Sequence, residues 1–355
     1  MIKIDILNTV LLIIIGILLF ELIVFVHEGG HFITAKLSGV KVNEFALGMG
    51  PKLLKFQKGE TLYSLRLFPI GGFCAMEGED ADSEDERAFG NKAVWKRMII
   101  VVAGAFMNIV LGLILMIITL SPNKYFASTT IAEFAENATS SQQLMKDDQI
   151  QSINGYGINT STDLSFALAT AKSNTLDITV NRNGETKHFD NVKLPTLEKD
   201  DKEILQLDFK VYAIENNFGN LLSQTFMSTV STVKMVWASL IGLVTGQFGL
   251  NEVSGPVGMT SAISQAAGEG LKRSFGDGLL NLIYIMTIIT INLGVVNLLP
   301  IPALDGGRFV FLLIEAIRRK PIKPEYEGYV HAAGMVLLLV FMVIISIKDV
   351  FQLIL

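Results

Sequence analysis

The chain has 355 residues, of which 50% are hydrophobic and 18% are charged, and its net charge is −5. Soluble domains carry about 25% charged residues, so this composition excludes an ordinary soluble enzyme and a disordered protein, and the net charge gives no support for nucleic-acid binding. The single cysteine, Cys74, excludes an internal disulfide and a metal site built from several cysteines. Histidines are sparse, with four in the whole chain, so their positions indicate where a metal site could lie.

Four apolar segments predict transmembrane helices, because a helix needs about 20 apolar residues to cross a bilayer. Three have the full length and the last is shorter and tilted: Ile6–Val26, Met98–Leu120, Leu279–Leu299 and Ala332–Ile347. No small-residue cleavage site follows the first segment, so we expect it to remain in the protein rather than to be removed as a signal peptide.

The distribution of Lys and Arg predicts the orientation of these spans. The loop 32–97 holds 10 of them and the loop 300–331 holds 5, so we expect both loops in the cytoplasm. The region 121–278 holds 12 against 17 acidic residues, and we expect it outside together with both termini. Met235–Leu250 is also apolar, but a crossing there would invert every later span, so we interpret it as an interfacial helix.

Two regions between the spans are predicted to fold outside the bilayer core. In 39–77, turn residues separate four short predicted strands, which are Val40–Leu47, Leu53–Phe56, Leu62–Leu67 and Phe73–Met76. The acidic run Glu77–Glu86 is expected to be a solvated loop. Residues 127–212 predict a small domain, with a helix over Ser161–Ala171 and a hairpin turn at Asn183-Gly184.

The first span ends in a metal-binding pattern, His27-Glu28-Gly29-Gly30-His31. Residues i and i+4 share one face of a helix, so both imidazoles can bind one zinc ion. The adjacent Glu28 can take a proton from water that zinc has acidified. Ionisable residues in a membrane segment are costly and functional by default. Gly29 and Gly30 leave room for a substrate or for a close-packed neighbour.

Glu21 lies seven residues before Glu28 and on nearly the same helix face. Two interpretations stay open. The carboxylate tunes the site or lines a water path, or it is protonated and bonds a neighbouring helix.

A catalytic zinc needs a third protein ligand. His188 is expected on the surface of the external hairpin, and His331 at the membrane interface where the last span begins. After the third span, Pro300 and Pro302 must break the helix. Broken backbone at membrane depth is tolerated where it lines a cavity, and Asp305 would present a carboxylate there or cap the next helix.

These two motifs, His27–His31 and Asn297-x-x-Pro-x-Pro-x-x-Asp305-Gly, resemble those of the site-2 protease family of intramembrane zinc metalloproteases. The nearest match is the bacterial regulator of sigma-E protease (RseP/RasP) type, and the resemblance covers nearly the whole chain. Gly255-Pro256-Val257-Gly258 also matches a family segment. The predicted orientation agrees, because it puts both motifs on the cytoplasmic side.

The resemblance implies a role for each matching residue. His27, His31 and Asp305 would bind zinc, and Glu28 would be the general base. Asn297, Pro300 and Pro302 would help to form the site and engage substrate. It also implies a polytopic α-helical membrane protein with four transmembrane helices, a small membrane-associated β-sheet and one external PDZ-like α+β domain.

Two departures from the family pattern stand out. Ala105 occupies the place of a proline in the second span, which changes backbone stiffness but no chemistry. In the PDZ-like domain, Asp147-Asp148 replaces the usual Gly-Asp. A missing glycine deforms the loop that would bind a peptide carboxylate, which argues against capture of C-terminal peptides.

The division of the chain that we predict has seven parts. They are 1–36, the first transmembrane helix; 37–80, the β-sheet; 81–120, the acidic loop and second transmembrane helix; 121–215, the PDZ-like domain; 216–278, an interfacial amphipathic region; 279–310, the third transmembrane helix and Asp motif; and 311–355, the cytoplasmic loop and fourth transmembrane helix.

The predicted function is cleavage of single-pass proteins in the cell membrane, in contact with lipid, at a site near the cytoplasmic side. Anti-sigma factors and signal-peptide remnants are the expected substrates. An extended substrate would pair with a sheet edge at Gly71, Gly72 and Phe73, unless these residues form a plain turn. The alternatives are a zinc-stabilised scaffold that recruits partners through its PDZ-like domain and, more weakly, a transporter. The sequence does not give the oligomeric state.

Overall fold

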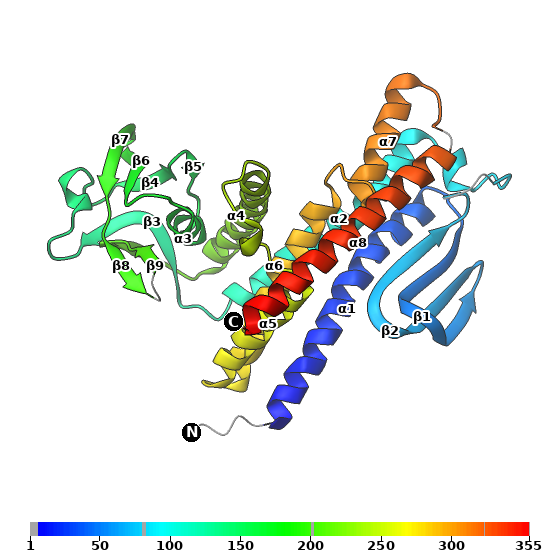
Figure 1. Ribbon diagram of the computed structural model, residues 1–355, viewed down its shortest axis with the longest axis horizontal. Helices are drawn as coiled ribbons and strands as arrows, with labels where there is room; N and C mark the ends of the chain where they lie inside the picture. Colours follow the sequence, from blue (N-terminus) through cyan, green and yellow to red (C-terminus); the bar gives the residue numbers. More distant parts are fainter. Residues whose placement is uncertain (1–5, 80–82, 200–201, 323, 355) are drawn as a thin grey trace. The chain divides into compact units, whose positions relative to one another are not determined.

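The computed structural model describes residues 6–79, 83–199, 202–322 and 324–354 (Figure 1). It divides the chain into a helical unit, Met1–Leu115 with Ser239–Leu355, and a β-rich unit, Met116–Ala238. In chain order the described α-helices are α1 (Ile6–Leu37), α2 (Val94–Leu120), α3 (Ser161–Ala169), α4 (Phe218–Val244), α5 (Pro256–Leu271), α6 (Phe275–Asn297), α7 (Asp305–Arg318) and α8 (Pro324–Ile354). Short 3-10 helices cover Phe89–Asn91, Ser140–Gln142 and Leu250–Glu252.

The described strands form three sheets. Their bounds are β1 (Val42–Lys58), β2 (Thr61–Met76), β3 (Tyr125–Phe134), β4 (Gln149–Ile153), β5 (Tyr156–Gly157), β6 (Thr175–Arg182), β7 (Glu185–Lys193), β8 (Thr196–Lys199), β9 (Lys202–Leu205) and β10 (Phe209–Glu215). In the helical unit, β1 pairs with β2. In the β-rich unit, β8 pairs with β9, and a six-stranded sheet has the order β10-β3-β4-β6-β7 with β5 on β4.

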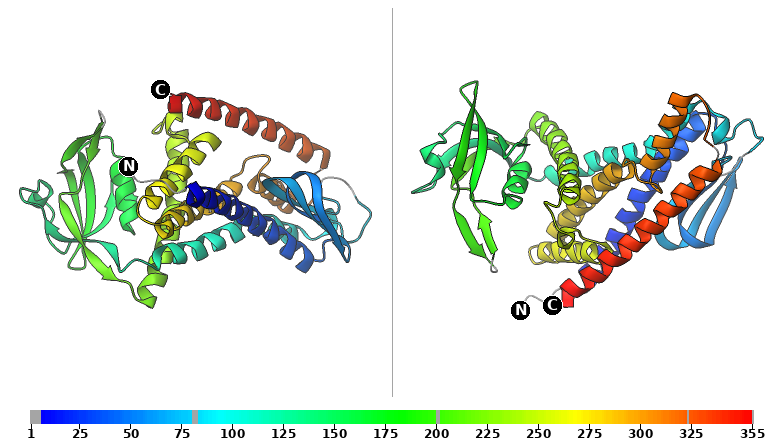
Figure 2. Two further views of the ribbon diagram at one scale, coloured as in Figure 1. Left: turned by 90° about the horizontal axis from the view of Figure 1, so that it is seen from below. Right: turned by 45° about the horizontal axis from the view of Figure 1, so that its top comes forward.

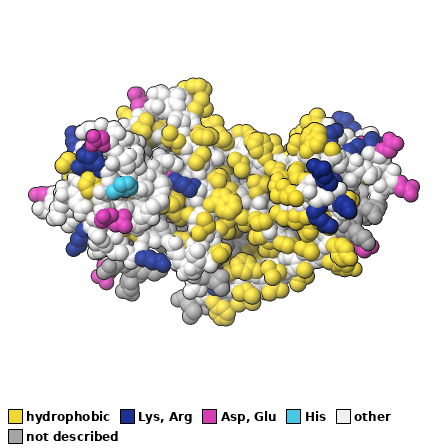
Figure 3. All heavy atoms as spheres, turned by 90° about the horizontal axis from the view of Figure 1, so that it is seen from above, with side chains coloured by type: hydrophobic (Ala, Val, Ile, Leu, Met, Phe, Trp, Pro, Cys, Tyr) yellow, Lys and Arg dark blue, Asp and Glu magenta, His cyan; other side chains and the backbone are white. Residues whose placement is uncertain are grey.

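Long apolar helices dominate the helical unit. Among the described residues, five helices are long and apolar enough to cross a membrane: α1, α2, α4, α6 and α8. Their outward faces carry hydrophobic side chains (Figure 3), as a lipid environment requires. The last helix is longer than the predicted span Ala332–Ile347 because it starts at Pro324, a residue type favoured at the first helical position.

Helix α8 is the least covered of the five. In its most apolar stretch only 6% is buried, against 50% in that of α2. Two views show it running along the outside of the helical unit (Figure 2). Near its end, the Asp349 carboxylate accepts backbone N–H groups of Gly255 and Gly258 at 2.8 and 2.7 Å, which satisfies the first turn of α5.

The sheet after the first helix contains the four predicted strand segments, joined two by two into the continuous strands β1 and β2. Residues 44–47 of β1 pair with two segments of β2, 62–65 and 72–75, and residues 52–58 of β1 pair with 61–66. Gly48 and Gly50 adopt φ of +77° and +85°, where glycine is favoured. These glycines therefore bend the strand rather than end it, because a bulge changes direction without breaking the pairing.

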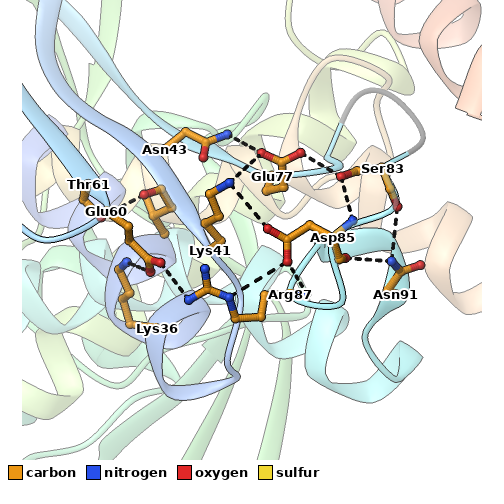
Figure 4. A network of polar contacts seen from close by, with 11 residues as sticks. Lys36, Lys41, Asn43, Glu60, Thr61, Glu77, Ser83, Asp85, Arg87 and Asn91 are labelled. Carbon is orange, nitrogen blue, oxygen red and sulfur yellow. Dashed lines mark hydrogen bonds and ion pairs between the residues drawn. The ribbon is translucent and has the colours of Figure 1, made fainter.

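The acidic segment after β2 is a loop that carries a polar network. Its residues 80–82 lie outside the described part of the chain. Glu77 accepts hydrogen bonds from Asn43 Nδ2 and Ser83 Oγ, and Asp85 lies 3.4 Å from Lys41 Nζ (Figure 4). The described residues of the run form a loop with partly exposed side chains, as predicted, and the network connects the first sheet to the segment leading into α2.

The β-rich unit has its own hydrophobic core. The fully buried side chains at its centre include Ile131, Leu144, Ile150, Leu176 and Ile178. The predicted helix is present as α3, where Thr160 and Asp163 form a capping box. The predicted hairpin is also present, because Arg182 pairs with Glu185 across the Asn183-Gly184 turn.

Helix α4 begins earlier than the predicted interfacial segment Met235–Leu250, and its polar face is the buried one. Thr225, Thr229 and Ser231 are buried. The Asp163 carboxylate accepts a hydrogen bond from Ser231 Oγ at 2.6 Å and lies 2.9 Å from Lys234 Nζ. These contacts attach α4 to α3 within the β-rich unit, while large apolar side chains of α4 stay exposed.

Candidate metal centre

The two histidines of α1 converge on Asp305. His27 Nε2 and His31 Nε2 lie 3.2 Å apart, because residues i and i+4 share a helix face. Asp305 Oδ2 lies 3.3 Å from His27 Nε2 and 3.5 Å from His31 Nε2. Both histidines are buried. Residues from the two ends of the sequence thus form one polar group inside the helical unit.

Helix α2 orients both imidazole rings. His31 Nδ1 donates to the Ile100 carbonyl at 2.8 Å, which leaves Nε2 free to bind a metal. The side-chain amide of Asn108, which is fully buried, lies 3.1 Å from His27 Nδ1. When Nε2 of His27 holds a metal, the ring proton is on Nδ1. The Asn108 amide, turned so that its oxygen and nitrogen exchange places, then offers Oδ1 as the acceptor.

Two glycines let α1 and α2 approach closely enough for this contact. A Cβ on Gly104 would lie 2.2 Å from His31 Nε2 and 2.9 Å from His27 Cε1. A Cβ on Gly30 would lie 2.5 Å from the Ala103 carbonyl oxygen, whereas one on Gly29 would meet nothing within 4 Å. Gly30 therefore serves a close-packed neighbour, and the space beside Gly29 is open.

A break between two helices presents Asp305. Helix α6 ends at Asn297 and α7 begins at Asp305, with Pro300 and Pro302 between them, as the sequence predicts. Asp305 is the first residue of α7 rather than its cap, which is Leu304. The glycines that follow Asp305 pack against the broken backbone: a Cβ on Gly306 would lie 2.1 Å from the Leu299 carbonyl oxygen.

The donor set fits a zinc ion. The ligand atoms of His27, His31 and Asp305 all lie within 4.8 Å of one another. Asp305 Oδ2 is a buried atom with no hydrogen-bond partner among the described residues, an arrangement that a metal would satisfy. Two nitrogens and a carboxylate oxygen suit zinc. Among the described residues this group has three members, so a fourth position stays open, as in catalytic rather than structural zinc sites.

Glu28 lies beside this group and contacts the first sheet. Its carboxylate lies near the backbone of Cys74 in β2. A Cβ on Gly72 would lie 3.4 Å from Glu28 Cγ and 3.0 Å from Val24 Cγ1. Strand β2 therefore packs directly on the helix that carries Glu28.

The structure places the other predicted site residues in two positions. Gly72 and Phe73 lie within β2, paired with Leu47 and Ala46, so the alternative of a plain turn was wrong. Arg66 covers the Phe73 ring at 4.8 Å. Asn297 is the last residue of α6, on the same break as the two prolines.

The other two ionisable candidates, His188 and Glu21, do not belong to the group of His27, His31 and Asp305. His188 belongs to the β6–β7 hairpin and bonds Thr179 Oγ1 at 2.8 Å, far along the chain from the metal group. Glu21 Oε1 is buried and has no hydrogen-bond partner among the described residues, which gives no support to a bond with a neighbouring helix.

Sequence reasoning missed Gly104, Asn108 and Ile100. All three act through the crossing of α1 and α2, and a single sequence does not reveal which helices cross. The one available signal was the Ala103-Gly104 pair followed by Asn108, which flank Ala105, the residue noted above as a departure from the family pattern.

A His-His-Asp group beside a glutamate, on helices apolar enough to cross a membrane, defines a membrane-embedded metalloprotease. The pattern of Peptidase family M50 matches residues 15–341, and the chain belongs to this family, the site-2 proteases. It is a zinc metalloprotease and a multi-pass membrane protein.

Similar proteins extend over nearly the whole chain. A protein from Clostridium acetobutylicum named as a zinc metalloprotease is 38% identical, covering 95% of this chain and 97% of its own length. The Regulator of sigma-W protease RasP of Bacillus subtilis is 31% identical, covering 94% of this chain and 97% of its own length.

Proposed function

We propose that this protease cleaves single-pass membrane proteins within or near the bilayer, with anti-sigma factors and signal-peptide remnants as substrate classes. The observation that carries the proposal is the meeting of His27, His31 and Asp305 at the end of an apolar helix. The name of the Bacillus subtilis relative, a regulator of sigma-W, favours the anti-sigma class.

Each residue of the site has a distinct task in this proposal. His27, His31 and Asp305 hold zinc, and zinc when bound supplies Lewis-acid polarisation and activation of water. Glu28 takes the proton of the attacking water and delivers it to the leaving amine. The packing of Gly72 against the Glu28 side chain helps to hold its carboxylate beside the site.

Four membrane crossings, by α1, α2, α6 and α8, account best for this site. The end of α1 meets Asp305, the first residue of α7, which follows α6 after a short loop. We therefore infer that α1 and α6 run in the same direction. Ile100, near the start of α2, meets the end of α1, so α2 runs the opposite way. An even number of crossings must therefore separate the end of α2 from the start of α6. Of the described helices between them, only α4 is long enough to cross, so we infer that α4 does not.

With both metal motifs on the cytoplasmic side, the β-rich unit is an external, PDZ-like domain that limits access to substrates already trimmed. Its six-stranded sheet and capped helix support this assignment. Helix α4 lies along the outer membrane surface. Its polar face is docked on Asp163 and its exposed side chains, including Phe226, Trp237 and Ile241, suit the headgroup boundary.

Strand β2 presents the substrate. A membrane helix hides its amides in internal hydrogen bonds, so a scissile segment must become extended before attack. Gly71, Gly72 and Phe73 lie on the strand that packs against Glu28, where an added strand would be held beside the site.

Cleavage of a tagged single-pass membrane protein tests the proposal. The enzyme and its Glu28→Gln variant would be compared at equal membrane levels, with zinc content measured for both. We expect the variant to keep zinc and to lose at least about 100-fold in cleavage rate, the usual contribution of a general base. Equal cleavage by both proteins would contradict the role of Glu28.

A further inference from the structure

Helix α8 contacts the loop that precedes Asp305 at two neighbouring points. His331 Nδ1 accepts a hydrogen bond from the backbone N–H of Ala303 at 2.9 Å. One turn further along α8, a Cβ on Gly334 would lie 2.5 Å from Pro302 Cβ and 2.7 Å from the Pro302 carbonyl oxygen. The contacted residues, Ala303 and Pro302, lie within three positions of Asp305, whose carboxylate faces the two histidines.

The backbone of this loop needs outside support at Ala303. Its φ is +78°, in a region that residues with a side chain rarely adopt. Most other non-glycine residues with positive φ in the described chain are Asn or Asp, whose side chains can bond the local backbone. Alanine has no such group. Strained backbone of this kind persists where the surroundings hold it, and His331 supplies that hold from another helix.

His331 is itself positioned by a chain of charged residues. Because Nδ1 accepts a hydrogen bond, the ring proton is on Nε2, which lies 3.8 Å from Glu327 Oε1. Glu327 Oε1 lies 3.5 Å from Arg308 Nε, and Arg308 also contacts Glu79. Glu79 in turn accepts the backbone N–H of Met76, the last residue of β2. The polar chain connects the end of the first sheet, α7 and α8 to the loop.

We propose that His331 and Gly334 are positioning residues that hold the 300–305 loop so that Asp305 faces His27 and His31. The inference rests on the proposed role of Asp305 as a zinc ligand. His331 fixes the direction of the Ala303 N–H, and the missing side chain of Gly334 lets Pro302 seat against α8. Residues that orient a metal ligand from outside contribute about 10- to 100-fold to metal affinity.

The test measures the zinc dissociation constant of the purified full-length protein by competition with a chelator. We expect His331→Leu to bind zinc about 10- to 100-fold more weakly. His331→Asn places an acceptor oxygen where Nδ1 stood and is expected to recover most of that affinity. Tyr329→Leu, an exposed position on the same helix, serves as the control and should match the parent protein.

A pair of glycine substitutions on α8 tests the second contact. Gly334→Ala places a methyl group against Pro302 and should weaken zinc binding, whereas Gly328→Ala meets nothing within 4 Å and should not. The thermal unfolding midpoint of each variant is recorded in parallel. Weaker zinc binding that tracks a lower midpoint, with no recovery in His331→Asn, would overturn the positioning role in favour of general stability.

Asp305→Asn separates this inference from the proposed site. If Asp305→Asn abolishes zinc binding while His331→Leu and Gly334→Ala leave it unchanged, the role of α8 is wrong and the site stands. If Asp305→Asn also leaves zinc binding unchanged, the assignment of the ligand fails, and the positioning inference fails with it.

Discussion

Gly104 faces the imidazoles of His27 and His31 where α1 and α2 cross. We expect Gly104→Ala to abolish zinc binding, because the added methyl carbon would lie 2.2 Å from His31 Nε2, the atom that would hold the metal. Moving the helices apart to make room would break the close packing of Gly30 against the Ala103 carbonyl. Zinc content of the purified protein, measured by atomic absorption, checks this prediction.

Gly29→Ala is the matched control for Gly104→Ala. It adds the same methyl group next to the same histidines, but into open space, so the protein should retain zinc. Loss of zinc in both variants, or in neither, would show that the close approach of the two helices does not govern the site.

The three candidate metal ligands could be named from the sequence because local signals mark each of them. Covalent spacing alone brings His27 and His31 to one helix face, and two prolines mark the break that carries Asp305. Asn108 and Gly104 have no such local signature. Their roles depend on which helices cross and at what depth, which the order of apolar segments does not specify.

At the scale of elements, Asp163 attaches α4 to the rest of the β-rich unit. Its side chain is fully buried and its partner Lys234 is about a quarter exposed. We expect Lys234→Met to weaken the docking of α4 by about 2 kcal/mol, typical of a hydrogen bond to a buried charge. Hydrogen exchange of α4 amides in the full-length protein measures this, with the exposed Lys210→Met as a control that should change nothing.

The same docking should depend on pH. Burial opposes ionisation of Asp163, but hydrogen bonds from Ser231, Lys234 and the Asn159 N–H outweigh it and hold the pKa of this carboxyl below its usual value. A lowered folded-state pKa stabilises the docked state above the unfolded pKa of about 3.9, and this stabilisation is lost as the pH falls through the folded pKa. Protection of α4 amides, measured relative to their intrinsic exchange rate at each pH, should therefore be full at pH 6 and fall below about pH 4. An exchange rate that tracks only the intrinsic chemistry would contradict this.

Strand β2 should act through its backbone. Phe73→Pro removes an N–H and restricts the strand beside Gly72, so we expect cleavage to fall about 10-fold or more while zinc stays bound. Phe73→Ala keeps the backbone and should retain more activity than the proline variant. Unchanged cleavage by Phe73→Pro would exclude strand pairing as the way in which substrate is held.

The elements show where sequence patterns stop being informative. The turn residues within 42–76 correctly mark four pairing segments, but they do not show that these segments run on in pairs as two continuous strands. A glycine that bends a paired strand and one that ends it look alike in sequence. The helix Ser161–Ala169 and the Asn183-Gly184 hairpin were predictable because their caps and turn residues are local.

For the whole molecule, membrane topology can be tested with single cysteines, because Cys74 is the only one in the chain. In a Cys74→Ala background, Ser141→Cys should react with an impermeant maleimide in intact cells, and Lys320→Cys only after permeabilisation. Reaction of Lys320→Cys from outside would mean that α4 crosses the membrane. Retained cleavage by the Cys74→Ala protein provides the necessary control.

The metal group joins the first helix to the start of α7, with most of the polypeptide between them. During synthesis, His27 and His31 enter the membrane long before the ribosome reaches Asp305. A partly made chain therefore carries two of the three donor residues and cannot complete the group until α7 has been made. The order of the motifs along the gene thus puts completion of the group after translation of the β-rich unit.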